Sequence, residues 1–421
     1  MAYHTNPWMM LPFALWLALI ALAPLGFSQW WSRHYGKLAL LFAAVTIGYY
    51  LFVLRGGAVQ TVLRTLHDYF SFIVLIGSLY VVSGGIHFTV QCEGGPWRNV
   101  CFLAVGGLAA NVLGTTGASM LLIRPWLRLN GSRAAAYHVV FFIFIVANIG
   151  GGLTPIGDPP LLLGYLKGVP FWWVLRHCWP AWLLSMGLLL GTFYFIDRRH
   201  HHSAPRAAFG ESIFIGRWNL FFLAVIVASV FVSRPWFLRE VLMLAAAAGS
   251  FLTTKPKVHE ANQFSFEPML EVAVLFFGIF ATMIPALDWL QVNARSVLGS
   301  GISPGLVYWY SGGLSSVLDS APAYLAFASA LSGAFASVMS VEGSAGMTML
   351  LRIGSSYVAA LSTATVFFGA VTYIGNGPNL MVKTIAERQG VPVPAFPGYF
   401  FKWAVPILLP LLIIIRVIFI R

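Results

Sequence analysis

Residues 147–161 read Ala-Asn-Ile-Gly-Gly-Gly-Leu-Thr-Pro-Ile-Gly-Asp-Pro-Pro-Leu. This stretch lies in a strongly apolar part of the chain, yet it contains four glycines, three prolines and one acid, Asp158. Prolines remove helical amide donors and glycines permit unusual dihedral angles, so the stretch predicts a break in a helix. Non-helical backbone at membrane depth is tolerated only where it is buried in protein or lines a wet cavity. We therefore expect an internal site here.

The composition of the whole chain indicates an integral membrane protein. Of its 421 residues, 59% are hydrophobic and only 9% are charged, whereas soluble domains carry about 25% charged residues. Several apolar runs approach the ~20 residues that a membrane-spanning helix needs, which predicts about ten spans in addition to two re-entrant hairpins. We expect an all-α polytopic protein of the cell inner (plasma) membrane, surrounded by lipid.

The positive charge and the cysteines indicate no other class of protein. The net charge is +12, but the basic residues are scattered over loops, where they set membrane topology, and we expect no nucleic-acid partner. The three cysteines lack the paired spacing of a disulfide framework or a zinc site. We expect no cofactor. The three histidines at 200–202 are interpreted as part of a solvated loop, with metal binding as the alternative.

The chain divides near its midpoint at a polar stretch, residues 197–216, which we interpret as a cytoplasmic linker. The half before it, residues 1–196, is predicted to contain a re-entrant hairpin at about 98–127 and a broken helix at about 134–167. The half after it, residues 217–421, is predicted to contain a hairpin at about 304–338 and a broken helix at about 353–388.

The two halves carry similar motifs in the same order. VLGTTGA at 112–118 matches VLDSAPA at 317–323, and TPIGDP at 154–159 matches TYIGNG at 372–377. An odd number of spans in each half would place the second copy upside down, and inverted repeats with broken helices are typical of secondary transporters. The expected break positions are Gly150, Gly151, Gly152, Pro155, Gly157, Pro159, Gly375, Gly377 and Pro378.

Of the 13 acidic residues, only Asp158 and Asp319 fall at breaks within apolar sequence. Charge inside a membrane is costly and marks a functional site. Hard cations prefer oxygen ligands, and burial favours a protonated carboxylate, so we expect sodium and protons as the transported or coupling ions, with sodium bound at the two aspartates. The other expected ligands are nearby hydroxyl and amide side chains, namely Thr115, Thr116, Asn148, Thr154, Ser320, Thr372, Asn376 and Asn379.

Three motifs, NIGGGLTPIGDPP at 148–160, SSVLDSAPAYL at 315–325 and TYIGNGPNLMV at 372–382, resemble the ion transporter superfamily over nearly the whole chain. The closest similarity is to the branch of NhaD-type sodium/proton antiporters and citrate-transporter-like proteins. The resemblance implies a homodimer with a scaffold part and a transport part that moves like an elevator. The transport part would contain both hairpins and both broken helices.

The resemblance also bears on individual residues. In NhaD-type antiporters a functional acid stands in the motif SPIGD, and Asp158 matches that acid. The threonines that follow it there are replaced by Pro159, Pro160 and Leu161, and the acid of their first hairpin by Gly114. In dicarboxylate symporters each hairpin tip carries Ser-Asn-Thr, which binds substrate carboxylates. Here the two tips read Gly-Thr-Thr at 114–116 and Asp-Ser-Ala at 319–321.

Three functions follow from these observations. The first is sodium/proton antiport through Asp158 and Asp319, which is favoured because no arginine or lysine is convincingly placed inside the membrane. The second is sodium- or proton-coupled uptake of citrate or a dicarboxylate, with half-helix N-termini holding the anion. The third is an intramembrane aspartyl hydrolase in which the two aspartates share a proton. A hydrolase gives no reason for a duplicated architecture, so we expect a transporter and not an enzyme.

Overall fold

The structure is a computed structural model that describes residues 5–420 except 90–93, 201–212, 233, 236, 295, 297–300 and 339–344. The described chain is helical almost throughout. Its one small sheet pairs β1 (His87–Thr89) with β2 (Ile213–Ile215) in antiparallel register. The predicted all-α class is therefore confirmed.

The first half of the chain forms η1 (Pro7–Met10), α1 (Leu11–Gly26), α2 (Ser28–Gly48), η2 (Tyr49–Leu54), α3 (Ala58–Gly84), α4 (Pro96–Asn130), η3 (Gly131–Arg133), α5 (Ala136–Ile145), η4 (Ile149–Gly151), α6 (Pro159–Leu166) and α7 (Trp173–His200). The second half forms α8 (Arg217–Ser229), α9 (Leu238–Thr253), α10 (Pro256–Ala261), α11 (Glu267–Val292), α13 (Pro304–Val317), α14 (Ser320–Val338), α15 (Ala345–Ile353), α16 (Ser355–Phe368), α17 (Gly377–Arg388), α18 (Phe396–Tyr399), η5 (Phe400–Leu408) and α19 (Leu409–Phe419).

Six of the described helices are long and apolar enough to cross a membrane, or seven if a pair bent by 97° at Gly354 forms one span. These helices confirm a multi-pass membrane protein. The number is below the roughly ten spans that the apolar runs predict. Several of those runs form short or interrupted helices, and α5, with ten residues, reaches only about 15 Å.

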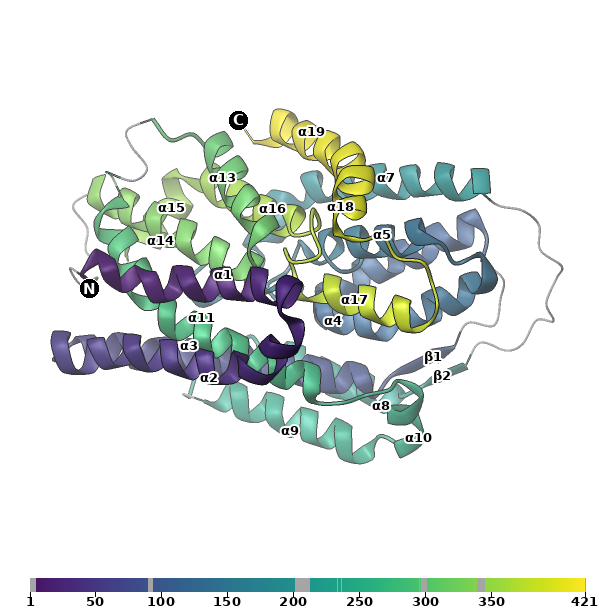
Figure 1. The fold of residues 1–421 in the computed structure, drawn as a ribbon, viewed down its shortest axis with the longest axis horizontal. Helices are drawn as coiled ribbons and strands as arrows, with labels where there is room; N and C mark the ends of the chain where they lie inside the picture. The colour runs from purple at the N-terminus through teal and green to yellow at the C-terminus, as the bar shows by residue number, and fades with distance from the viewer. Residues whose placement is uncertain are drawn as a thin grey trace.

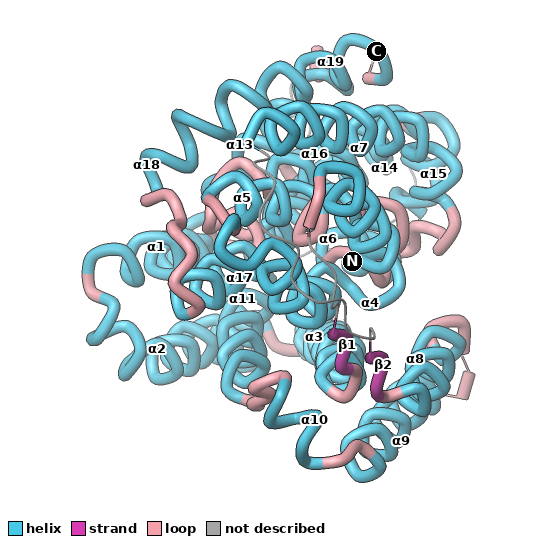
Figure 2. The backbone as a smooth tube through the Cα atoms, turned by 90° about the vertical axis from the view of Figure 1, so that its right-hand side faces the viewer, coloured by secondary structure: helices cyan, strands magenta, loops and turns pink. Residues whose placement is uncertain are grey.

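The long helices lie side by side (Figure 1). On one side of the molecule α11 packs against α1, α2 and α3, and α9 packs against α3 and α8. On the other side α13 packs against α16, and α4 packs against α7 and α17. Contacts of α3 with α4, and of α11 with α14, join the two sides. The end view in Figure 2 places α8, α9 and α10 at the edge of the molecule, beside the short β1–β2 pair.

The helix α4 is a hairpin that turns at Gly114. This glycine has φ 74° and ψ 153°, a conformation outside the helical region that favours glycine. The two ends of α4 lie together, because the Gly94 amide donates to the Leu129 carbonyl over 2.7 Å and the Asn99 amide group donates to Asn130 over 2.8 Å. This turn lies within the hairpin predicted at about 98–127.

The other predicted breaks coincide with interruptions of the helices. The second hairpin consists of α13 and α14, which are separated by extended backbone at Leu318 (φ −112°, ψ 165°) and by Asp319. Between α5 and α6 the chain contains only the short η4, and between α16 and α17 residues 369–376 are non-helical. The interrupted segment of the first half is deeply buried, since every residue from Val139 to Ala147 is 0% exposed.

The predicted linker at 197–216 differs from the structure at both ends. Residues 197–200 continue α7, and residues 213–215 form β2. Asp197 is not solvated but fully buried, because polar groups of α4 and α5 surround it. His200 belongs to the end of α7, whereas His201 and His202 lie outside the described residues.

Candidate functional site

Glycines at the two breaks let neighbouring segments of the backbone approach each other closely. A Cβ atom at Gly157 would collide with the carbonyl oxygen of Gly151, and one at Gly375 would lie 2.7 Å from the carbonyl oxygen of Gly369. Contacts below 3.0 Å are essentially never made by real Cβ atoms. These positions therefore require glycine for packing and not for an unusual φ.

Each hairpin tip is hydrogen-bonded to the break of its own half. The Thr115 amide donates to the Gly157 carbonyl over 2.8 Å, and the Ser320 amide donates to the Gly375 carbonyl over 3.2 Å. Thr115 and Ser320 occupy matching positions in the two motifs, as do the two glycines. The same contact therefore occurs once in each half.

A second pair of matching hydrogen bonds fixes the same junctions. The Thr154 hydroxyl donates to the Asn111 carbonyl over 2.5 Å, and the Thr372 hydroxyl donates to the Ser316 carbonyl over 2.6 Å. These hydroxyls also accept from the amides of Gly157 and Gly375. The two threonines, expected as ion ligands, are thus occupied in joining hairpin to break.

Asp158 stands at the N-cap of α6 and is 1% exposed. Its Oδ1 accepts hydrogen bonds from the Thr115 hydroxyl over 2.8 Å and from the Asn376 side-chain amide over 2.9 Å. Its Oδ2 is buried and has no hydrogen-bond partner among the described residues. The carboxylate therefore connects the first hairpin to the second break and keeps one oxygen free for a ligand.

Amide side chains join the two breaks to each other. Asn376 also donates to the Ala147 carbonyl over 3.2 Å. Asn148 donates to the side-chain oxygen of Asn379 over 2.7 Å, and Asn379 donates in turn to two carbonyls of its own break, those of Gly369 and Thr372. Asn148 and Asn379 are both 0% exposed, so the contact between the halves lies in the interior.

Asp319 lies at the tip of the second hairpin and is partly exposed. Its carboxylate accepts a hydrogen bond from the Ala321 amide over 3.0 Å. The next residue, Ser320, donates to the carbonyl of Gly375, which precedes Asn376, the residue that donates to Asp158. Among the described residues, the ion pairs of the chain do not include either aspartate. The predicted pair of acids is thus brought into one region, with no basic side chain to neutralise it there.

A small cavity of about 20 Å³ lies beside Asp158. Its walls are Leu75, Ile76 and Leu79 of α3, residues 113–117 of the first hairpin, residues 155–159 of the break, and Leu162. A cavity needs roughly 10–15 Å³ on this measure to hold a water molecule, so this one has room for a water or a small ion. Thr116 lines it, whereas Ser320 is buried outside its walls, and its hydroxyl has no partner in the described part of the chain.

The sequence did not single out two residues that build this region. Asn111, one turn before the tip of the first hairpin, donates to the Gly150 carbonyl over 2.6 Å and accepts from the Leu153 amide over 3.0 Å. Ser315 donates to the Thr365 carbonyl over 2.7 Å. A polar residue facing apolar neighbours just before a hairpin tip is the signal that would have found them.

A polytopic membrane protein with interrupted helices around a buried carboxylate has the construction of a secondary transporter. Comparison with known proteins agrees with this class. Residues 2–420 match the family described as "Putative citrate transport", and the chain belongs to that family.

Two similar proteins come from Mycobacterium tuberculosis (strain ATCC 25618 / H37Rv). "Uncharacterized transporter Rv2684" is 23% identical over 349 residues, and "Uncharacterized transporter Rv2685" is 22% identical over 355 residues. Each match covers 76% of this chain and 79% of the relative. The chain is therefore a transporter and not an enzyme, which sets the aspartyl hydrolase aside. The family assignment does not extend to the NhaD-type branch in particular.

Proposed function

We propose that this protein exchanges sodium for protons and that Asp158 is the residue to which the two cations bind in turn. The observation that carries the proposal is the free Oδ2 of a fully buried carboxylate next to a cavity of ionic size. A buried ionised carboxylate is stable only when a charge partner or hydrogen bonds compensate it. No basic side chain of the described residues pairs with Asp158, so a bound cation is the natural compensation.

Competition between a sodium ion and a proton for one carboxylate explains how the protein would exchange the two ions. A proton on Oδ2 removes the charge, and a sodium ion compensates it with oxygen ligands. Because the oxygen atom is the same, one ion must leave before the other binds. Asp319 is a second carboxyl group at the tip of the hairpin that bonds to the break of Asn376, and when ionised it would further favour a cation.

Uptake of a carboxylate such as citrate is the second candidate, and the family description favours it. Helix N-termini attract anions, and three of them lie within one hydrogen-bonded region. These are α6 at Asp158, α17 at Asn376 and α14 at Ser320. In this function sodium or a proton at Asp158 would bind first and reduce the repulsion of the anion.

We further propose the assembly and placement that the resemblance implies: a homodimer in the cell inner membrane, with inverted halves and an elevator-type movement. The matched contacts of Thr115 with Gly157 and of Ser320 with Gly375 support two related halves. Broken helices at corresponding positions of two repeats support alternating access around the region where the repeats meet.

Reconstitution tests the proposed function. Purified protein in liposomes receives an inward sodium gradient in buffer without organic anions, and a fluorescent dye reports the internal pH. Proton efflux driven by sodium alone supports exchange. Flux that appears only after citrate or a dicarboxylate is added supports carboxylate uptake and contradicts exchange.

A further inference from the structure

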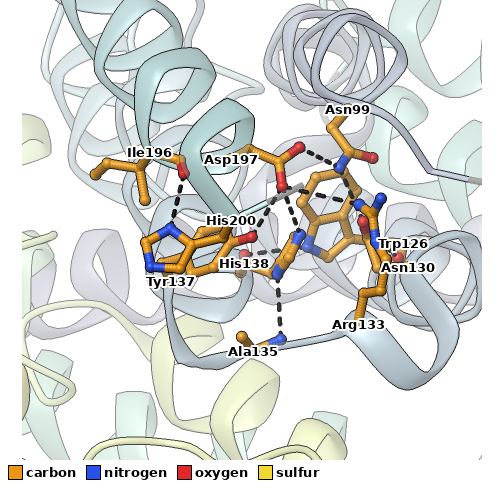
Figure 3. Close-up of polar contacts among 10 residues, drawn as sticks. All are labelled: Asn99, Trp126, Asn130, Arg133, Ala135, Tyr137, His138, Ile196, Asp197 and His200. Atoms are coloured by element: carbon orange, nitrogen blue, oxygen red, sulfur yellow. Dashed lines mark hydrogen bonds and ion pairs between the residues drawn. The ribbon is translucent and has the colours of Figure 1, made fainter. Parts of the chain in front are cut away.

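A second buried carboxylate lies at the opposite end of α5 from the break. Asp197, in the last turn of α7, is 0% exposed. Its Oδ2 accepts from the Asn99 side chain over 2.8 Å, and its Oδ1 accepts from the Tyr137 hydroxyl over 2.8 Å. The Arg133 guanidinium lies 3.8 Å from Oδ1, and His138 Nε2 lies 3.5 Å from it. Figure 3 shows these groups arranged around the carboxylate.

The partners with printed hydrogen bonds come from α4 and α5, two of the elements that carry the first half of the candidate site. Asn99 belongs to the first arm of the α4 hairpin and also donates to Asn130 at the end of the second arm. Tyr137 begins α5, which leads to the break that contains Asp158. One carboxylate therefore holds together both arms of the hairpin, the start of the broken helix and the end of α7.

His138 is held as a neutral ring that adds to this arrangement. Its Nδ1 accepts a hydrogen bond from the Ala135 amide over 3.1 Å, which leaves the ring proton on Nε2, facing Asp197. Its carbonyl accepts from the Trp126 indole over 3.0 Å. The carbonyl of His138 thus ties α5 to α4, and its ring lies against Asp197 of α7 without a hydrogen bond within the described residues.

The cluster has no polar connection along α5 to Asp158. Residues 139–147 are all apolar and 0% exposed. A proton cannot pass along such a surface, since no group on it can bind one. The connection that the structure shows between the cluster and the site is a packed helix about 15 Å long, whose far end is followed by Asn148, tied to Asn379.

We propose that Asp197 is a positioning residue: it clamps the α4 hairpin, α5 and α7 into one unit, so that Thr115 and Asp158 keep their mutual geometry during transport. The inference rests on the proposed function. Removing the clamp leaves Asp158 in place but loosens the hairpin tip that donates to it.

The test compares Asp197→Asn with Asp288→Asn. Asn has the same size as Asp but lacks one acceptor and the charge, so it presents an NH₂ group to one of the existing donors. Asp288 is a matched control, because it is also buried, accepts from a tyrosine hydroxyl (Tyr50, 2.7 Å) and lies on α11, outside the clamp. Both proteins are measured for melting temperature, sodium-driven proton flux and amide hydrogen exchange at residues 113–117.

We expect Asp197→Asn to raise the apparent KM for sodium at least tenfold and to speed amide hydrogen exchange at residues 113–117. Asp288→Asn should change this KM less than twofold. Tyr137→Phe, which keeps the charge and removes one hydrogen bond, should act in the same direction more weakly and serves if Asp197→Asn does not fold. If the Asp197 and Tyr137 variants keep the wild-type KM for sodium and the wild-type rate of amide hydrogen exchange at residues 113–117, the clamp is refuted. If the wild type shows no sodium-driven flux, the proposed function fails, and hydrogen exchange alone then decides whether the clamp exists.

Discussion

One oxygen of the Asp158 carboxylate accepts two hydrogen bonds, and the other accepts none from the residues that the structure describes. The two donors come from Thr115 in the first half and Asn376 in the second, so the residue is positioned by both halves. The free oxygen distinguishes it from a structural acid. A purely structural carboxylate in this interior would be expected to have all its acceptors satisfied.

Replacing Asp158 with Asn tests this interpretation. The amide keeps the size of the side chain and removes the charge that holds a cation. The amide can neither take up a proton nor compensate the charge of a sodium ion, so sodium-driven proton flux should fall to the level of protein-free liposomes. Sodium-driven proton flux in liposomes is the measurement, with melting temperature in detergent as the check on folding. Wild-type flux in this variant would refute the role of Asp158.

Among the secondary-structure elements, the site depends on helices that are interrupted at the breaks and at the hairpin tips. Hairpin tips and breaks are joined through the carbonyls of Gly157 and Gly375, which a continuous helix would use internally. The close approach of Gly157 to Gly151 leaves no room for a side chain. The geometry of the break is therefore set by backbone packing as much as by proline.

The substitution Gly157→Ala should damage the break without touching a polar side chain. Overpacking of an interior typically costs about 1–3 kcal/mol, and the displaced carbonyl would pull away from Thr115. We expect a lower melting temperature and a reduced transport rate. Gly187→Ala in α7 is the matched control, since nothing lies within 4 Å of its added methyl group and alanine stabilises a helix interior by about 0.5–1 kcal/mol relative to glycine. A control that lost as much stability as Gly157→Ala would contradict the packing argument.

At the scale of the whole molecule, the two halves are fastened together by asparagines. Asn148 and Asn379 contact each other across a sequence separation of 231 residues, and Asn376 reaches Ala147 and Asp158 from the other half. Neutral amides can make these contacts in the interior without the desolvation penalty of an ion pair. The site is therefore built only when both halves are folded.

A double-mutant cycle with Asn148→Ala and Asn379→Ala measures this contact. Each substitution leaves buried groups unpaired, at about 1–3 kcal/mol per group, and the pair should be coupled by about 0.5–3 kcal/mol. Melting temperatures of the four proteins provide the coupling. Asn293→Ala, whose side chain follows α11 and donates to the Trp289 carbonyl of that helix, should show no coupling with Asn148→Ala. Additive effects of Asn148→Ala and Asn379→Ala would contradict a direct link.

Some residues of these clusters are predictable from the sequence and others are not, for a physical reason. Asp158 could be found because an acid among glycines and prolines contrasts with its apolar surroundings. Asp197 was wrongly placed in a solvated linker, because Arg198, Arg199 and His200 follow it. Its burial depends on Tyr137 and Asn99, which are 60 and 98 residues away in the chain. Thr154 and Thr372 were expected as ion ligands, but their hydroxyls bond to backbone.

The amino-acid sequence alone determined the membrane class, the helical fold and the positions of the breaks, because these follow from local hydrophobicity and from the backbone limits of glycine and proline. Which polar groups contact one another depends on the tertiary structure. Among the described residues no group donates to Oδ2 of Asp158, whereas Asp197 is buried and hydrogen-bonded to Asn99 and Tyr137. Hydrogen bonds between segments far apart in the chain depend on packing, which no local pattern encodes.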